Sequence, residues 1–138
     1  MEQIKREMET LSLKEQEYKK EISHIKREIS EAKDVLIRLN KSIQKFENSV
    51  SAKRNINSSV TYNTKVFKTY ISKLNLMLSG NSYKKARGNF DEIVFNINCN
   101  IRKLNQDMEY VKEQLTNIQR NKNELQQRYN QLMSEMES

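Results

Sequence analysis

The chain has 138 residues, 36% of them hydrophobic, and its 25 Lys and Arg outnumber 18 Asp and Glu for a formal net charge of +7. No apolar run approaches the roughly 18 residues of a membrane-spanning helix, and no signal-peptide hydrophobic region is recognisable, so we expect neither a membrane-spanning protein nor Sec export. The length predicts one structural unit covering 1–138, and the single cysteine excludes an internal disulfide.

The first predicted element is a long helix at about residues 3–78. From Met8 to Leu78, apolar residues recur at alternating steps of three and four, and 17 of the 21 positions in this register are apolar or aromatic. This 3.5-residue period predicts a left-handed coiled-coil seam. The sequence contains no Pro, which permits uninterrupted helices of this length.

A polar stretch at 48–64 weakens this first arm. Ten of its 17 residues are Asn, Ser or Thr, which are weaker helix formers, and the seam positions Lys53, Asn57 and Thr64 are polar. Because the register continues through the stretch, we interpret it as a hinge within one helix. A loop that divides the arm into two helices is the alternative.

The one interruption of the helical pattern is at Gly80. It follows Leu78, the last seam residue of the first arm, where a left-handed C-cap glycine is expected. The same period resumes at Tyr83, with 14 of 16 seam positions apolar, and predicts a second helix at about 82–136. Ser82 is a candidate N-cap of that helix.

These elements predict an all-α fold, an antiparallel helical hairpin of the coiled-coil type with unequal arms and a turn at about residues 79–82. Because the second arm is shorter, we expect roughly the first 20 residues to extend beyond it. A two-helix seam buries little surface, and polar seam residues weaken it further. We therefore expect a partner, either a second copy or a different helical protein.

The region around the predicted turn is basic. No Asp or Glu occurs from Asn48 to Asn89, a stretch that contains eight Lys and Arg. Such a surface suits an acidic protein, a phosphate backbone or a membrane headgroup. A solvated basic face, or a compositional bias toward Lys and Asn, explains the same pattern.

The sequence shows no catalytic or metal-binding motif. It has no phosphate-binding loop and no nucleophile with a base, and His24 lies outside the seam without a Cys or His neighbour. Cys99 also lies outside the seam, and an exposed free thiol suits a reducing cytosol. Since a thin hairpin offers no concave pocket, we expect no enzymatic activity, cofactor or small-molecule substrate.

Near the predicted turn, apolar residues extend beyond the seam in both arms. A widened apolar face packs further helices, and the alternative is a thicker intramolecular core. The candidate partner-binding residues are Tyr70, Met77, Tyr83, Phe90, Val94 and Phe95.

The turn also carries a resemblance. The run Leu78-Ser79-Gly80-Asn81-Ser82-Tyr83-Lys84-Lys85-Ala86, followed by Asn89-Phe90-Asp91-Glu92-Ile93, resembles the turn of the WXG-type small helical hairpins of Gram-positive type VII secretion. Leu78 stands in place of the family's Trp, Gly80 matches the turn glycine, and Ala86 and Phe90 match the downstream apolar positions. In length the chain is more similar to longer relatives, including the small helical partners of LXG-domain toxins.

Two features depart from that family. The Trp is absent, and neither Tyr110 nor Tyr129 is followed four residues later by the acidic residue of the family's export signal. The resemblance implies a cytoplasmic targeting factor or chaperone that binds the helical N-terminal region of an effector, or a second small hairpin protein, as a four-helix bundle. A partner would then supply the export signal, and the two proteins would leave the cell together.

Two other functions remain open. One is a structural coiled-coil homodimer or tether, which needs no specific surface near the turn. The other is a binder of nucleic acid or of a membrane surface through the basic region, although the sequence shows neither an aromatic stacking platform nor a lipid-binding amphipathic face.

Overall fold

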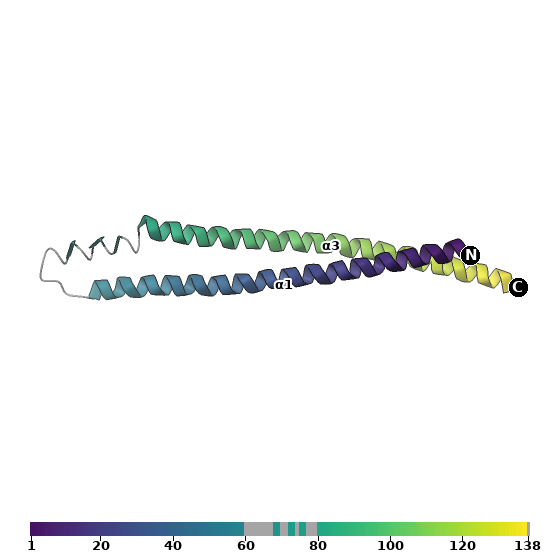
Figure 1. The fold of residues 1–138 in the computed structure, drawn as a ribbon, viewed down its shortest axis with the longest axis horizontal. Helices are drawn as coiled ribbons and strands as arrows, with labels where there is room; N and C mark the ends of the chain where they lie inside the picture. Colours follow the sequence, from purple (N-terminus) through teal and green to yellow (C-terminus); the bar gives the residue numbers. More distant parts are fainter. Residues whose placement is uncertain (60–67, 70–71, 74, 77–79, 138) are drawn as a thin grey trace. The chain divides into compact units, whose positions relative to one another are not determined.

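In a computed structural model of the protein, two long helices, α1 and α3, lie side by side and run in opposite directions (Figure 1). The structure describes residues 1–59, 68–69, 72–73, 75–76 and 80–137. These residues contain no strand. The predicted all-α helical hairpin is therefore confirmed.

Helix α1 covers Glu2–Ser59 without a break. The polar stretch predicted as a hinge is thus helical from 48 to 59, while its remaining residues, 60–64, lie outside the described part. Val50 lies within the polar stretch and is only 7% exposed. Burial of this seam residue stabilises the helix where intrinsic helix propensity is low.

Helix α3 covers Asn81–Glu137, close to the predicted second arm. The backbone N–H of Lys84 donates to the carbonyl of Gly80 at 3.1 Å, so Gly80, and not Ser82, occupies the N-cap position. Gly80 does not have a positive φ, and the expected left-handed C-cap is therefore wrong. A Cβ at Gly80 would instead meet the backbone carbonyl oxygen of Leu76, which favours glycine here for its small size.

The seam follows the predicted heptad register. Met8 (position a) and Leu11 (position d) begin the register of α1, and Tyr83 (position d) begins that of α3. Every a and d residue from these points to Val50 in α1 and to Leu132 in α3 is buried or half-buried. The described exceptions lie beyond those limits and are Lys53 and Met136, both exposed.

The antiparallel register gives the helix pair two different flanks. Positions e of the two helices lie on one flank and positions g lie on the other. We call the flank formed by positions a, e and b the e face, and the flank formed by positions d, g and c the g face.

The chain divides into two units, unit 1 (Met1–Glu31 and Ile101–Ser138) and unit 2 (Ala32–Asn100). In unit 1, Val111 packs against three isoleucines of α1 to form the core. The core isoleucines are Ile22, Ile25 and Ile29, and the half-buried residues around them are Tyr18, Ile101, Leu104, Met108 and Leu115.

The start of α1 packs on the end of α3 in unit 1. Ile4 is 8% exposed, and Lys5 Nζ lies 5.7 Å from the centroid of the Tyr129 ring. The expected overhang of the first 20 residues is therefore absent. The described helices α1 and α3 have 58 and 57 residues.

Aromatic contacts fix the pairing of the helices in unit 2. The Phe46 ring stacks on Tyr83 at 5.8 Å between centroids and meets Phe90 edge-on at 5.6 Å. Tyr83 also bonds to Glu47, which lies 36 residues earlier in the chain. A reversal confined to residues 79–82 would set Tyr83 beside the residues just before Gly80. The predicted pairing, with Tyr83 beside the end of the first arm, is therefore corrected: Tyr83 lies beside Phe46 and Glu47.

Candidate partner-binding surfaces

Two of the predicted partner-binding residues lie in the seam of unit 2. Tyr83 and Phe90 are both half-buried and lie on either side of Phe46. Tyr83 stacks on Phe46 and Phe90 meets it edge-on, the two arrangements that aromatic pairs prefer. These two side chains form an intramolecular core, which was the alternative interpretation of the widened apolar face. A role for them in partner binding would require the hairpin to open.

A polar cluster lies next to this aromatic contact. The Tyr83 hydroxyl donates to the Glu47 carboxylate and lies 2.7 Å from Oε1 and 2.6 Å from Oε2. Arg87 Nε lies 2.9 Å from Glu47 Oε1, and Arg87 Nη1 lies 3.4 Å from Asp91 Oδ1 without making a hydrogen bond. Arg87 occupies a seam position, and the carboxylates of Glu47 and Asp91 together balance its charge.

The remaining predicted residues differ in exposure. Val94 is half-buried at a seam position, whereas Phe95 is 66% exposed. Leu78, Tyr70 and Met77 lie outside the described residues. The structure thus brings Tyr83, Phe90 and Val94 into the seam and leaves Phe95 exposed.

Unit 1 contains a second polar pair in the seam. Glu15 and Lys122 both occupy position a, and Lys122 Nζ lies 3.3 Å from Glu15 Oε2. Lys19 Nζ lies 3.0 Å from Glu15 Oε1. The hydrogen bonds from Lys19 and from Lys122 hold the pKa of the Glu15 carboxyl below its ordinary value, against the opposing effect of burial.

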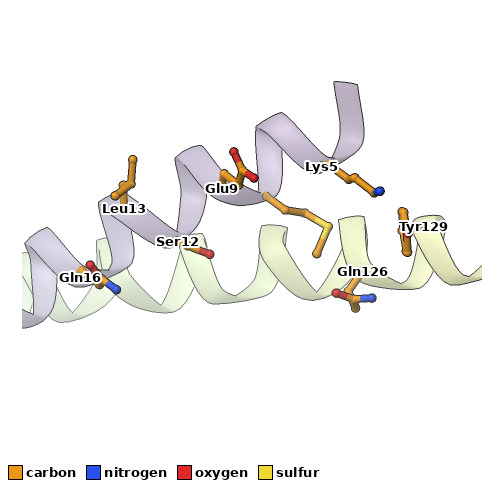
Figure 2. Close-up of a pocket in the computed structure, with 8 residues that line it drawn as sticks. Lys5, Glu9, Ser12, Leu13, Gln16, Gln126 and Tyr129 are labelled. Carbon is orange, nitrogen blue, oxygen red and sulfur yellow. The ribbon is translucent and has the colours of Figure 1, made fainter. Parts of the chain in front are cut away.

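The e face of unit 1 contains a groove between the helices (Figure 2). Met8 and Tyr129 form its apolar floor, and Lys5 and Glu9 place one charge of each sign at its edge. Leu13, which is 62% exposed, lies at the α1 side of the groove. The other lining residues are Ser12, Gln16 and Gln126.

The g face of unit 1 has a groove of its own. Leu11 and Leu125, both at position d, form its floor, and Arg6, Glu7 and charged residues of α3 line its edges. A two-helix hairpin exposes such a groove on each flank, because no third helix covers the sides of the seam.

Unit 2 exposes large apolar side chains on both flanks of the helix pair. On the g face, Val35 and Ile93 are 51% and 46% exposed. On the e face, Ile37 and Phe95 are 53% and 66% exposed. Phe95 is one of the predicted partner-binding residues. Val35 and Ile37 were missed, although they immediately precede and follow the seam residue Leu36.

His24 lies on α1 and Cys99 lies on α3. His24 Nε2 lies 2.9 Å from Glu28 Oε1 on the outer surface of α1, and Cys99 is half-buried as a free thiol. Within the part that the structure describes, no group of His, Cys, Asp and Glu side chains could hold a metal ion. None of the described helices is sufficiently long and apolar to cross a membrane.

Comparison with protein-family models, with curated proteins and with solved structures gives no match for this chain.

Proposed function

We propose that this chain is a non-enzymatic interaction protein that binds a helical region of another protein and forms a four-helix bundle with it. The observation that carries the proposal is how little the hairpin covers its own apolar residues. Among the described residues only seven are buried, none is less than 2% exposed, and apolar side chains such as Leu13 and Phe95 are more than 60% exposed. Helix bundles bury such residues under further helices.

The geometry of the flanks supports a helix as the partner. Both grooves of unit 1 run between two antiparallel helices and have apolar floors with charged edges. A third helix packs into such a groove by placing its side-chain ridges between those of the pair, at about 8–10 Å from each axis.

Within this function, the resemblance at the turn favours a role in type VII secretion. The chain would bind the helical N-terminal region of an effector, or a second small hairpin protein, as a targeting factor or chaperone. Because the chain lacks the family's export signal, the partner would carry it, and both proteins would be exported together from the cytoplasm.

Affinity capture from the native cells tests the proposal. The tagged chain should recover a protein with a helical N-terminal region, and a hairpin variant that cannot fold should recover none. Ile43→Asp is a suitable variant, because it places a charge at a seam position that is 7% exposed. Capture of the same protein by both baits, or capture of the chain itself alone, would contradict the proposal. The second result would favour a structural coiled coil.

The secretion role has its own test. Deleting the gene should lower the amount of the captured effector in the culture medium, and wild-type chain supplied in trans should restore it. An unchanged amount of effector in the medium would remove the secretion role while leaving the helical interaction in place.

A further inference from the structure

The positive charge of the chain is concentrated in unit 2. Residues 32–100 contain 12 Lys and Arg against four Asp and Glu, a net charge of +8. The segments of unit 1 contain 13 Lys and Arg against 14 Asp and Glu, a net charge of −1. Any partner of unit 2 therefore meets a surface with a strong positive potential.

The two faces of unit 2 differ in charge. All four acidic residues of the unit fall at positions e or f: Asp34, Glu47, Asp91 and Glu92. The described g face therefore carries no acidic residue. On α1 it carries three exposed cations, Arg38 and Lys45 at position c and Lys53 at position d.

Small side chains occupy three of the g positions on this face, Ser42, Ser49 and Ala86. The contacts of Phe46 with Tyr83 and Phe90 fix the register of α1 against α3. In this register Ser42 is opposite Ile93, and Ser49 is opposite Ala86.

Small residues allow the close approach of a third helix. The Ser42 hydroxyl already donates to the carbonyl of Arg38 at 3.1 Å, so covering it leaves no unpaired donor. Val35 and Ile93 provide the exposed apolar contacts of this surface.

We propose that the g face of unit 2 binds an acidic amphipathic helix of the partner. This inference rests on the proposed function and adds to it the surface and the chemistry of the partner. The apolar stripe of that helix would cover Val35 and Ile93, and its carboxylates would face Arg38 and Lys45.

Other occupants fit the surface less well. A second copy would bring another unit of net charge +8, or a unit 1 in which acidic and basic residues are nearly balanced. Aliphatic side chains such as Val35 and Ile93 offer nucleic-acid bases no stacking surface. An interfacial membrane helix carries one apolar face, whereas unit 2 exposes apolar residues on both flanks.

A designed peptide probe tests the charge preference. The probe is a four-heptad amphipathic helix with Leu on one stripe and Glu elsewhere, and the matched probe has Lys in place of Glu. By fluorescence anisotropy with the full chain, the Glu peptide should bind at least tenfold more tightly than the Lys peptide. Its affinity should fall as NaCl rises from about 50 to about 300 mM. Equal binding of the two peptides, or no binding of the Glu peptide, would overturn the inference.

Matched variants locate the surface. Arg38→Glu with Lys45→Glu should weaken binding of the Glu peptide at least tenfold. Lys33→Glu with Lys84→Glu, which makes the same charge change at exposed e positions, should weaken it less than threefold. Equal losses in the two variants would show that only the net charge matters.

A second matched pair of variants tests the apolar contacts. Val35→Gln with Ile93→Gln should weaken binding of the Glu peptide at least tenfold, and Ile37→Gln with Phe95→Gln on the e face should not. Gln keeps helix propensity high, and circular dichroism should show the same helix content in all variants.

Two further results separate this inference from the proposed function. If the captured partner binds equally well to the Arg38 and Lys45 variant, the helical interaction holds and the surface is wrong. If the capture recovers no helical protein while the peptide binds as expected, the surface holds and the proposed function is wrong. Tighter binding of single-stranded DNA or anionic vesicles than of the Glu peptide, lost in the same variants, would overturn the inference.

Discussion

Lys122 Nζ lies 3.3 Å from Glu15 Oε2, which joins two seam residues 107 positions apart in the chain. A charged pair at an otherwise apolar seam adds little stability, but it penalises every register that separates the two charges. Glu47 and Arg87 do the same in unit 2 at 2.9 Å. Polar pairs thus set which residues of the two helices meet, while the apolar residues supply the stability.

The Glu15 contacts predict a pH dependence of stability. The folded-state pKa of Glu15 lies below its ordinary value, so its contribution is present above about pH 4.5 and is lost as pH falls through the folded-state pKa. Glu15→Gln should lower the Tm at pH 7 by about 2–4 °C. The difference from wild type should shrink toward pH 3. Thermal unfolding followed by circular dichroism measures this, and a difference independent of pH would contradict the assignment.

Burial in the seam predicts unequal effects for two isoleucines of unit 2. Ile43→Ala, at 7% exposed, should lower the free energy of unfolding by about 2–4 kcal/mol because it leaves a cavity between the helices. Ile37→Ala, at 53% exposed, should change it by less than about 0.5 kcal/mol. Both variants make the same chemical change in α1. Urea denaturation compares them, and similar losses would mean that Ile37 is also buried.

The Tyr83 hydroxyl predicts a stability effect separate from its ring. Tyr83→Phe keeps the ring beside Phe46 but removes the hydrogen bond to Glu47, and it should cost about 1–2 kcal/mol. Tyr110→Phe is the control, because Tyr110 is 63% exposed and its change should cost less than about 0.5 kcal/mol. If urea denaturation finds equal values for the two variants, the hydroxyl does not stabilise unit 2.

The two glycines predict effects of opposite sign. A Cβ at Gly88 has no atom within 4 Å, so Gly88→Ala should stabilise α3 by about 0.5–1 kcal/mol through helix propensity. Gly80→Ala should destabilise the protein, since its Cβ would meet the backbone oxygen of Leu76. Thermal unfolding of both variants decides the matter, and a gain in both would show that the backbone at Gly80 relaxes easily.

The heptad pattern predicted the seam residues well but not their partners. A period of 3.5 residues shows which face of each helix is apolar, and sliding one helix by a heptad leaves that pattern unchanged. The prediction therefore relied on Gly80 to place the turn, whereas Gly80 is the N-cap of α3. The available signal was electrostatic. Glu15 and Lys122 are seam residues of opposite charge, and an antiparallel register that joins them also places Lys5 near Tyr129.

The candidate surface was harder to predict for a related reason. Tyr83 and Phe90 are prominent apolar residues near the predicted turn, but their exposure depends on which residue of α1 faces them. Once Phe46 lies between them, they belong to the seam. Val35 and Ile93 are exposed on the g face, because positions g lie beside a two-helix seam and are covered only when further helices pack against it.

The mass of the purified chain, alone and with its captured protein, tests the central claim most directly. We expect light scattering to give a mass near 16.5 kDa for the chain alone and the sum of the two masses for the mixture. A stable particle of twice 16.5 kDa that does not change when the captured protein is added would contradict the account and identify a self-contained coiled-coil dimer.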